Sequence, residues 1–315
     1  MSKVSVIVPI YGVEAYIERC VKTLFLQTLT DIEFIFVDDC SLDSSVTILK
    51  QLEVEYSERL MQDNKVVKLY RMSENSGQAA VRKFAIQQAT GDYIIHCDSD
   101  DWIEEDMYKR MYDIALETSS DIVICDFYQS TYSEDKYIKA CYNHEMPKLA
   151  YDLLQGRGYW SLCNKLVRRS LYDQVKIYPK DNMGEDMVIM LQLLHYSNRV
   201  SYIEQAYYHY FVNPTSIVRN NSEENIIKKF TQVANNVTLI ENFFRGKYSG
   251  LSFIQSLDSL KFRQLNILIP MLREKHYWRI WRKTFSSLKY RIWINPNVSL
   301  RNKVKYYLRL LRLYK

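Results

Sequence analysis

The first 130 residues alternate short runs of β-branched and other apolar residues with stretches in which apolar residues recur every three or four positions. A run of the first kind is typical of a buried strand, and the second spacing is typical of an amphipathic helix. Regular alternation of the two predicts βαβ units, with parallel strands in one sheet and helices on its faces. The expected strands are 4–10, 32–37, 66–70, 93–97 and 121–127, and the expected helices are 14–27, 43–55, 78–89 and 104–117.

Three of the expected strands end in residues suited to a turn or to a ligand. Tyr11 and Gly12 follow the first strand, Asp38 and Asp39 follow the second, and residues 98–101 follow the fourth. In open α/β sheets, ligands bind just outside the carboxyl ends of the strands. We therefore expect the three strand ends to face one cleft.

Residues 98–101 read Asp-Ser-Asp-Asp and directly precede Trp102. Three carboxylates within four residues repel one another unless a cation or solvent compensates them. Mg²⁺ or Mn²⁺ would do so, because these ions take oxygen ligands and share them with phosphate. A solvated turn at the start of the helix 104–117 is the alternative. An EF-hand loop is excluded, since Trp102 takes a ligand position and Ile103 stands where that loop needs glycine.

The second and third strands are followed by two further candidate segments. Asp39 could accept hydrogen bonds from a base or a ribose, whereas Ser41 or Asp43 suits the N-cap of the next helix. Gly77 permits close approach of the backbone to a phosphate at a helix N-terminus, and Arg82 follows about one turn later. An ordinary capped helix explains each segment when it is taken alone.

After about residue 130 the alternation fades. We expect helices at 147–155 and 185–197, short strands at 200–203 and 206–211, and an almost wholly helical stretch at 222–313. The fold class predicted from these patterns is α/β: a Rossmann-like, mostly parallel sheet flanked by helices, with a helical C-terminal extension.

Composition assigns the chain to the ordinary globular class, with 47% hydrophobic and 25% charged residues. The six cysteines show no CxxC pair and no zinc spacing, so we expect reduced, mostly buried thiols. The apolar run Val4–Ile10 is too short for a signal peptide, and no run approaches the roughly 18–20 residues that span a bilayer. The expected location is the cytoplasm.

Charge is distributed unevenly. The chain carries a net charge of +5, but residues 275–315 hold twelve Lys or Arg and no Asp or Glu, which leaves a net −7 on the first 274 residues. Trp278, Trp281, Trp293 and the run 306–313 are interleaved with these charges, as in helices that lie in the interface of an anionic membrane. The alternative is a helix that packs on the rest of the protein and keeps a basic outer face. No nucleic-acid partner is expected, because no recognised module accompanies the charge.

The order of the segments gives a more specific indication than any one of them. VSVIVPIY, FVDDCS, NSGQAAVRK and GDYIIHCDSDDW, in this order, resemble the donor half of family 2 glycosyltransferases. SLCNKLVRR at 161–169 and MGEDM at 183–187 resemble the family's Lys-containing segment and its Glu-Asp base motif. The resemblance covers residues 3–130 and, more loosely, 155–217. It implies a GT-A fold with a nucleotide-sugar-binding half at 1–130 and an acceptor-side half at 131–220, followed by a basic helical region at 221–315.

The resemblance also implies roles for individual residues. The base of the nucleotide would be held by Pro9, Tyr11 and Asp39, and the catalytic base would be Asp186. Ribose and a divalent metal ion, Mn²⁺ or Mg²⁺, would be bound by Asp98 and Asp100. Further donor contacts are expected from Arg82 and Ser99, and contacts to the acceptor or diphosphate are candidates at Trp160, Lys165, Glu185 and His209.

The chain departs from the family pattern at three places. Gly12 stands where the family usually has Asn, and Lys83 replaces the Asn that commonly follows the motif Arg. The stretch 207–218 resembles the family's aromatic segment but lacks the Arg often found there. A packed His209 and a packed Trp160 remain alternatives to a ligand-binding role.

The implied reaction is an inverting hexosyl transfer from a nucleoside-diphosphate sugar, expected to be UDP-linked, to a hydroxyl of a glycan or lipid-linked glycan, as in bacterial surface polysaccharide synthesis. Such an enzyme could lie peripherally on the inner face of the plasma membrane through 275–315. A nucleotidyltransferase or other nucleotide-sugar enzyme is one alternative, although the first-strand loop YGVEAY lacks the Gly-rich phosphate loop expected there. A non-catalytic sugar-binding protein on the same fold is another.

Overall fold

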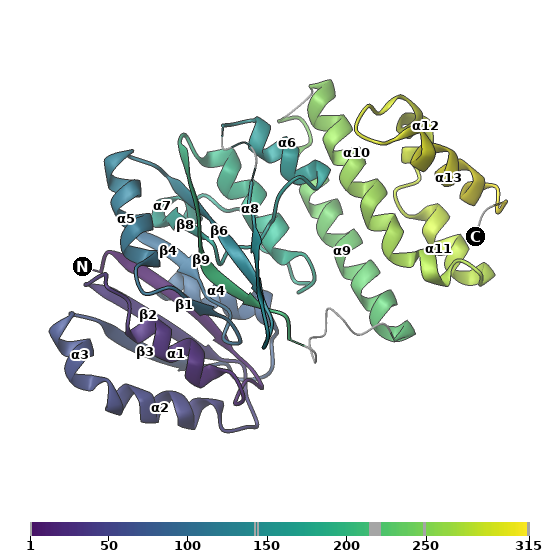
Figure 1. The fold of residues 1–315 in the computed structure, drawn as a ribbon. Coiled ribbons are helices and arrows are strands. Elements are labelled where there is room, and N and C mark those ends of the chain that lie inside the picture. Colours follow the sequence, from purple (N-terminus) through teal and green to yellow (C-terminus); the bar gives the residue numbers. More distant parts are fainter. Residues whose placement is uncertain (1, 142, 144, 214–221, 248–249, 314–315) are drawn as a thin grey trace.

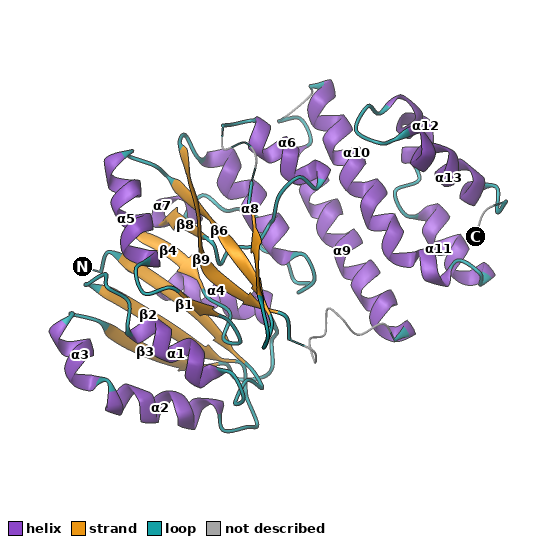
Figure 2. Cartoon of the chain, viewed as in Figure 1, coloured by secondary structure: helices purple, strands orange, loops and turns teal. Residues whose placement is uncertain are grey.

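The computed structural model of the chain describes residues 2–141, 143, 145–213, 222–247 and 250–313. The strands are β1 (Val4–Ile10), β2 (Ile32–Asp38), β3 (Val66–Arg71), β4 (Tyr93–His96), β5 (Trp102–Ile103), β6 (Ile122–Ser130), β7 (Asp135–Ile138), β8 (Lys165–Arg168) and β9 (Val200–Phe211). The helices that accompany the sheet are α1 (Ile17–Phe25), α2 (Ser45–Glu55), α3 (Ser57–Gln62), α4 (Gln78–Gln88), α5 (Met107–Glu117), α6 (Lys148–Gln155), α7 (Arg169–Tyr172) and α8 (Glu185–Tyr196). Figure 2 shows one sheet covered by helices, beside a part of the chain that is wholly helical.

The strands form one sheet in the order β3-β2-β1-β4-β8-β6-β9-β5, and β7 pairs with β6. The four strands β3, β2, β1 and β4 are all parallel, whereas β8 runs antiparallel to both of its neighbours. In the second half, β9 runs parallel to β6 and antiparallel to β5. The expected α/β architecture is therefore confirmed, and the antiparallel pairs gather in the half where the sequence alternation fades.

In the parallel half, the inner strands β1 and β2 are buried on both faces, whereas the edge strand β3 is only partly buried. Every residue of β2 and all but one of β1 are buried, which explains why their sequences are continuous apolar runs. In the register of β1 and β2, Ile10 lies opposite Asp38, so both strands end at the same level. The residues that follow them therefore emerge side by side at one edge of the sheet.

Helices cover both faces of this half (Figure 1). α1 buries residues at spacings of three and four, so one apolar stripe faces the sheet: Ile17, Cys20, Val21, Leu24 and Phe25. α1 and α2 pack against each other on one face, and α4 packs on β1 and β2 from the opposite face. α4 begins at the sheet edge where these strands end, since the Ser76 and Gly77 amides just before it bond to Asp39 after β2.

Two details of the sheet differ from the sequence expectation. The predicted short strands 200–203 and 206–211 form a single strand, β9, with an irregular register against β6 at Cys125–Phe127. Residues 102–103 form β5 rather than the approach to a helix, and α5 begins only at Met107. Pairing of β5 with β9 places Trp102 opposite His209.

The C-terminal region is helical, as expected. It contains α9 (Glu223–Phe244), α10 (Leu251–Leu265), η2 (Asn266–Met271), α11 (Lys275–Lys283), α12 (Leu288–Arg291), η3 (Ile292–Ile294) and α13 (Leu300–Leu310). One apolar cluster joins α8 to α9 and α10, and a second lies within the helical region. The expected boundary at 220/221 lies outside the described residues.

Candidate donor and base site

The ends of β1, β2 and β4 meet as their order in the sheet requires. Backbone hydrogen bonds join the residues just beyond the strands: the Asp39 amide donates to Ile10 (2.9 Å) and the Cys97 amide donates to Ile7 (2.9 Å). Tyr11, directly after β1, is 55% exposed. Asp39 is buried and Asp98 is half-buried. The residues that follow β1, β2 and β4 therefore lie together at one edge of the sheet, as expected from the sequence.

Asp39 fixes the loop between β3 and α4. Its two carboxylate oxygens accept the backbone amides of Ser76 (2.7 Å) and Gly77 (2.8 Å). Asp38 faces a different set of partners, the Ser41 amide (2.8 Å) and Arg71 (2.8 Å). The second and third sequence motifs thus meet in space through Asp39.

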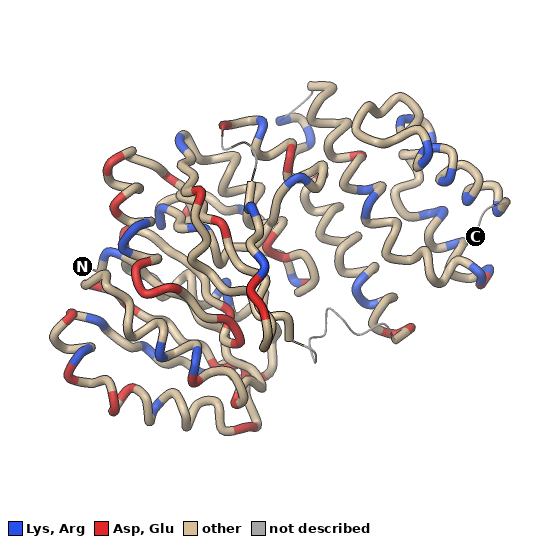
Figure 3. The backbone as a smooth tube through the Cα atoms, viewed as in Figure 1, with Lys and Arg blue, Asp and Glu red and all other residues tan. Residues whose placement is uncertain are grey.

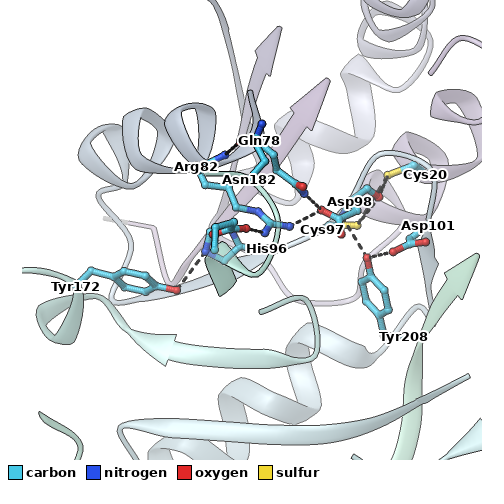
Figure 4. A network of polar contacts seen from close by, with 12 residues as sticks. Cys20, Gln78, Arg82, His96, Cys97, Asp98, Asp101, Tyr172, Asn182 and Tyr208 are labelled. Carbon is cyan, nitrogen blue, oxygen red and sulfur yellow. Dashed lines mark hydrogen bonds and ion pairs between the residues drawn. The ribbon is translucent and has the colours of Figure 1, made fainter. Parts of the chain in front are cut away.

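Arg82 links the donor half of the sheet to the start of α8 (Figure 4). One guanidinium nitrogen, Nη2, donates to Asp98 Oδ1 (2.6 Å), and Nη1 forms a short ion pair with Glu185. Burial by itself disfavours the cation, but the charges of Glu185, Asp98 and Asp186 outweigh this and raise the pKa of Arg82. The guanidinium is therefore a permanent positive charge between two acidic segments that are remote in sequence.

Glu185 and Asp186 begin α8 but have different surroundings. Glu185 is buried in the pair with Arg82, and burial raises its pKa to about 7 against the opposing charge of Arg82. Asp186 is less buried, and its Oδ1 accepts the amide of Met187 (2.8 Å). Burial also raises the pKa of Asp186, while Arg82 and Lys165 oppose the rise. Of the two, Asp186 is the carboxylate that is not engaged by Arg82 through a hydrogen bond.

The three carboxylates of the fourth motif have separate roles in the structure. Asp98 Oδ1 also accepts from Gln78 (3.1 Å), in addition to Arg82. Asp100 is half-buried and accepts from Asn213 Nδ2 (3.3 Å); burial and then the charge of Asp98 raise its pKa. The Ser99 residue between them is buried.

Asp101 points away from these two. It is buried, accepts the hydroxyl of Tyr208 in a short hydrogen bond, and accepts the amide of Phe211 (2.7 Å). Burial, followed by the charges of Asp100 and Asp98, raises its pKa well above the ordinary value. Asp101 therefore ties the turn after β4 to β9.

The remaining pair, Asp98 and Asp100, fits a divalent cation that a ligand helps to hold. Over residues 2–141, 143, 145–213, 222–247 and 250–313, no three His, Cys, Asp or Glu side chains converge as a protein-only metal cage. Mg²⁺ and Mn²⁺ sites in phosphate-binding enzymes commonly use one or two carboxylates and complete the shell with phosphate oxygens and water. Burial and, after it, the charge of Asp98 raise the pKa of Asp100, and a bound cation would offset both effects.

Lys165 and Trp160, two candidate contacts to the acceptor or diphosphate, make their contacts inside the protein. Lys165 is buried at the start of β8, where Nζ donates to the carbonyls of Tyr159 (3.1 Å) and Ser161 (2.7 Å) and to Asn164 Oδ1 (2.9 Å). Burial lowers its pKa to about 8. Trp160 is half-buried and packs against the sheet core and the α8–α10 cluster. The contacts of both residues are thus within the protein.

His209 lies in an aromatic stack. Its ring is stacked between Trp102 (4.9 Å between centroids) and Tyr128 (4.8 Å), Nε2 pairs with Glu104 (2.9 Å), and Nδ1 bonds Ser130 (3.0 Å). Tyr208, its neighbour on β9, faces Asp98 and Asp101 instead. Successive residues of a strand point to opposite faces of the sheet. The Tyr208 side chain therefore lies on the face of Asp98, whereas the His209 side chain lies on the opposite face, packed between aromatic rings. Residues 214–218 of the same aromatic segment lie outside the described part of the chain.

Several residues of the site were not singled out from the sequence. Asn213 bonds Asp100, and Arg19 Nη2 donates to the Asp100 carbonyl (3.2 Å) while its guanidinium lies 3.5 Å from the centre of the Trp102 ring. Asn182 accepts the amide of Ala79 (3.1 Å) and so caps α4 from the segment before α8. Gln78 and Asn213 lie inside the motifs already recognised, but nothing in their local spacing indicates a partner about 20 or 113 residues away.

Comparison with known proteins places this geometry in context. The sequence profile of glycosyl transferase family 2 matches residues 5–176, more than half of the chain. Glycosyltransferase GlyA of Streptococcus pneumoniae is 29% identical over 252 residues, which is 76% of this chain and 35% of GlyA. The next two curated relatives are each covered over 62% of their length. The chain thus spans between about a third and two thirds of the relatives it matches most strongly.

Two solved structures share the fold. S. aureus TarS 1-349 in complex with UDP-GlcNAc has a TM-score of 0.58 at 19% identity, covering 84% of this chain and 81% of that one. The mannosyltransferase PcManGT of Pyrobaculum calidifontis, in complex with GDP-Man and Mn²⁺, has a TM-score of 0.57 at 15% identity, covering 99% and 81%. At these identities the likeness establishes the GT-A fold.

Proposed function

The chain belongs to glycosyl transferase family 2, and from this premise we propose that it transfers a hexose from a nucleoside-diphosphate sugar to an acceptor hydroxyl with inversion at the anomeric carbon. One observation carries the proposal. Arg82 joins Asp98, at the end of β4, to Glu185 at the start of α8, so a donor carboxylate and a candidate base motif lie in one network. A non-catalytic sugar-binding protein would have no need for this connection.

The donor would lie across the ends of the parallel strands. Pro9, Tyr11 and Asp39 would hold the base, with Asp39 also fixing the loop at Ser76 and Gly77. Asp98 would receive the ribose, with Ser99 beside it and Arg82 holding its carboxylate in place. The complexes of TarS with UDP-GlcNAc and of PcManGT with GDP-Man support a nucleotide-sugar donor, and we propose a UDP-linked one.

A divalent ion, Mn²⁺ or Mg²⁺, would be held by Asp100 and Asp98 together with the diphosphate. When bound, it supplies a positive charge that stabilises the leaving diphosphate as the bond to the sugar breaks. This chain's own residues set the geometry of the pair: Asn213 and Arg19 hold the Asp100 side chain and carbonyl, and Arg82 and Gln78 hold Asp98. The Mn²⁺ in PcManGT supports this assignment.

Asp186 would serve as the general base on the opposite side of the sugar. As the acceptor oxygen forms its bond to the anomeric carbon, the bond to the diphosphate breaks and the hydroxyl proton passes to the Asp186 carboxylate, which must lie within about 3 Å of it. Glu185 is held by Arg82, which leaves Asp186 for this role. Its raised pKa makes Asp186 a stronger base than an ordinary aspartate.

The acceptor that we propose is a glycan or a lipid-linked glycan, as in bacterial surface polysaccharide synthesis. The acceptor side would be built by residues 131–220, and the basic segment 275–315 would locate the enzyme at the inner face of the plasma membrane. None of the helices within the described ranges is both long enough and apolar enough to span a bilayer. Attachment would therefore be peripheral.

Asp186→Asn tests the mechanism. We expect transfer of sugar to fall by roughly a hundredfold to ten-thousandfold, because the amide cannot accept the proton. Donor affinity in the presence of Mn²⁺, measured by calorimetry, should stay close to the wild-type value. Asp113→Asn, an exposed carboxylate paired with Lys109, is the control and should leave both quantities unchanged. Wild-type transfer by Asp186→Asn would refute the assignment.

A further inference from the structure

α13 carries two apolar faces, and only one of them is used inside the protein. On the inner face, Tyr306 is buried and contacts the rings of Phe262 (5.9 Å between centroids) and Trp281 (5.4 Å). A second stripe consists of residues at spacings of four, four and three positions, which fall on one side of a helix. Its members are exposed or half-buried: Leu300, Val304, Leu308 and Leu311.

The outer stripe continues onto η3. The Trp293 ring meets Tyr307 of α13 edge to face, at 5.8 Å between centroids, although 53% of Trp293 stays exposed. Trp293, Tyr307, Val304, Leu308 and Leu311 line an open groove of about 400 Å³. Exposed Ile294 and Tyr290 extend this apolar surface along the chain. We call the surface formed by Trp293, Ile294, Leu300, Val304, Leu308 and Leu311 the outer stripe.

Basic side chains flank the outer stripe on both sides. Each residue of a helix is rotated by about 100° from the one before it. Arg301 and Lys305, one position after Leu300 and Val304, therefore lie along one flank, and Lys303 lies along the other. Figure 3 shows Lys and Arg spread over α11–α13, whereas Asp and Glu gather on the sheet-bearing part.

The rest of the C-terminal tryptophans do not belong to this surface. Trp281 is buried in the helical core, and its indole N–H donates to the Leu265 carbonyl (3.1 Å). Trp278 is half-buried and donates to the Arg309 carbonyl (2.8 Å). Arg291 likewise is paired with the buried Asp258. Residues 275–315 therefore contain both packed tryptophans, Trp278 and Trp281, and an exposed one, Trp293.

We propose that the outer stripe docks the protein onto an anionic lipid bilayer, with its apolar side chains at the acyl boundary and the flanking Lys and Arg at the headgroups. Apolar insertion combined with basic flanks is the pattern by which interfacial helices bind anionic membranes. The inference rests on the proposed function, since a lipid-linked acceptor is what makes this location useful.

Charge complementarity favours a bilayer over a second copy of the chain. Two outer stripes in contact would bring their basic flanks together, with no acidic residue in 275–315 to compensate. An anionic surface attracts this region and repels the first 274 residues, which carry a net −7. The protein would therefore bind in one orientation.

The test is flotation of the full-length protein with vesicles of phosphatidylcholine alone or mixed with phosphatidylglycerol. We expect binding to the mixed vesicles, and weaker binding in high salt. Val304→Glu/Leu311→Glu replaces two exposed side chains of the stripe and should reduce binding about tenfold or more. Leu42→Glu/Leu116→Glu replaces two exposed leucines elsewhere and is the matched control.

Tryptophan emission gives a second measurement that does not depend on the glutamate variants. Mixed vesicles should shift the emission of the wild type to the blue, and Trp293→Phe should remove this shift, because Trp293 is the exposed indole of the stripe. Equal binding by Val304→Glu/Leu311→Glu and the control would overturn the proposal. So would equal binding to neutral vesicles, or self-association that the stripe variant abolishes.

Failure of docking can be separated from failure of the proposed reaction. Asp186→Asn should bind vesicles as the wild type does, because the outer stripe is intact. Val304→Glu/Leu311→Glu should bind the nucleotide sugar normally in a vesicle-free assay. If the wild type did not bind the nucleotide sugar, the proposed function would be refuted, but the measured binding to vesicles would still support docking.

Discussion

Arg82 is the residue at which the two halves of the site depend on each other. Its guanidinium is buried between Asp98 and Glu185, which lie 16 and 103 residues away in sequence. Removing one member of a buried ion pair leaves the other charges without compensation, which typically costs more than the pair contributes as a whole. The Arg82 guanidinium therefore positions the Asp98 carboxylate and also compensates the charge of the buried Glu185 carboxylate.

Arg82→Met should reduce the free energy of unfolding by about 3–5 kcal/mol, measured by urea denaturation. The double variant Arg82→Met/Glu185→Met should recover most of this loss, because the buried Glu185 carboxylate is removed together with its partner. Arg110→Met, which breaks the exposed pair with Asp106, should cost less than about 1 kcal/mol. If Arg82→Met lost no more unfolding free energy than Arg110→Met, this result would contradict a buried ion-pair network at Arg82.

Sequence reasoning identified Arg82, Asp98 and Glu185 one by one, but not the contacts between them. Each belongs to a motif with its own local signal, a strand end or a helix start. Their contacts depend on how α4 and α8 pack on the sheet, and no local periodicity carries that information. The same reason explains why Asn213 and Arg19 were missed beside Asp100.

Among the structural elements, the loop between β3 and α4 has the strictest backbone requirement. Gly77 precedes α4 with φ of 82° and ψ of 160°, a region that only glycine adopts readily. A Cβ at this position would lie 2.4 Å from Asn182 Nδ2. The Gly77 amide is also one of the two that Asp39 accepts, so the backbone shape and the donor carboxylate are linked.

Gly77→Ala should therefore destabilise the protein by about 1–3 kcal/mol from backbone strain, and more if the Asn182 side chain does not move. Donor affinity should fall as well, because the Ser76 and Gly77 amides would shift away from Asp39. Thermal unfolding and donor calorimetry measure the two effects. Gly246→Ala, at φ of 80° with no atom within 4 Å of its Cβ, is the control for strain alone and should leave donor affinity unchanged.

The parallel strands of the first half were predicted more closely than the strands of the second half. β1, β2 and β3 agree with the expected ranges to within one residue. β1 and β2 are continuous buried runs, and β3, which is only partly buried, is still marked by its apolar and β-branched residues. β5, β7 and β8 have two to four residues. β5 and β8 pair with strands that are distant in sequence, and β7 pairs with the preceding strand β6. Too few side chains are present in such segments to establish a period.

For the whole molecule, the basic C-terminal region is both a packed lobe and an exposed surface. α11–α13 contribute Trp281, Leu288, Ile292 and Tyr306 to a core that includes Phe262 of α10. Truncation before Lys275 would expose that core, so a shortened chain is a poor test of membrane binding. The sequence grouped all the tryptophans of the tail together because composition does not distinguish the faces of a helix.

Trp281→Ala and Trp293→Ala separate the two roles. Trp281→Ala should lower the free energy of unfolding by about 3–5 kcal/mol, because it empties a buried site and removes the hydrogen bond to Leu265. Trp293→Ala should change it by less than about 0.5 kcal/mol, since the side chain is half exposed. Equal losses in denaturant unfolding would mean that Trp293 also belongs to the structural core.

The link between Asp101 and β9 has a consequence for the order in which the site is completed during synthesis. The turn after β4 carries Asp98, Asp100 and Asp101, but the groups that hold Asp101, the Tyr208 hydroxyl and the Phe211 amide, come more than 100 residues later. A nascent chain that ends after α5 contains the acidic turn without its anchor. The three carboxylates can settle into one arrangement only when the ribosome has delivered β9, so this turn is among the last parts of the sheet edge to become rigid.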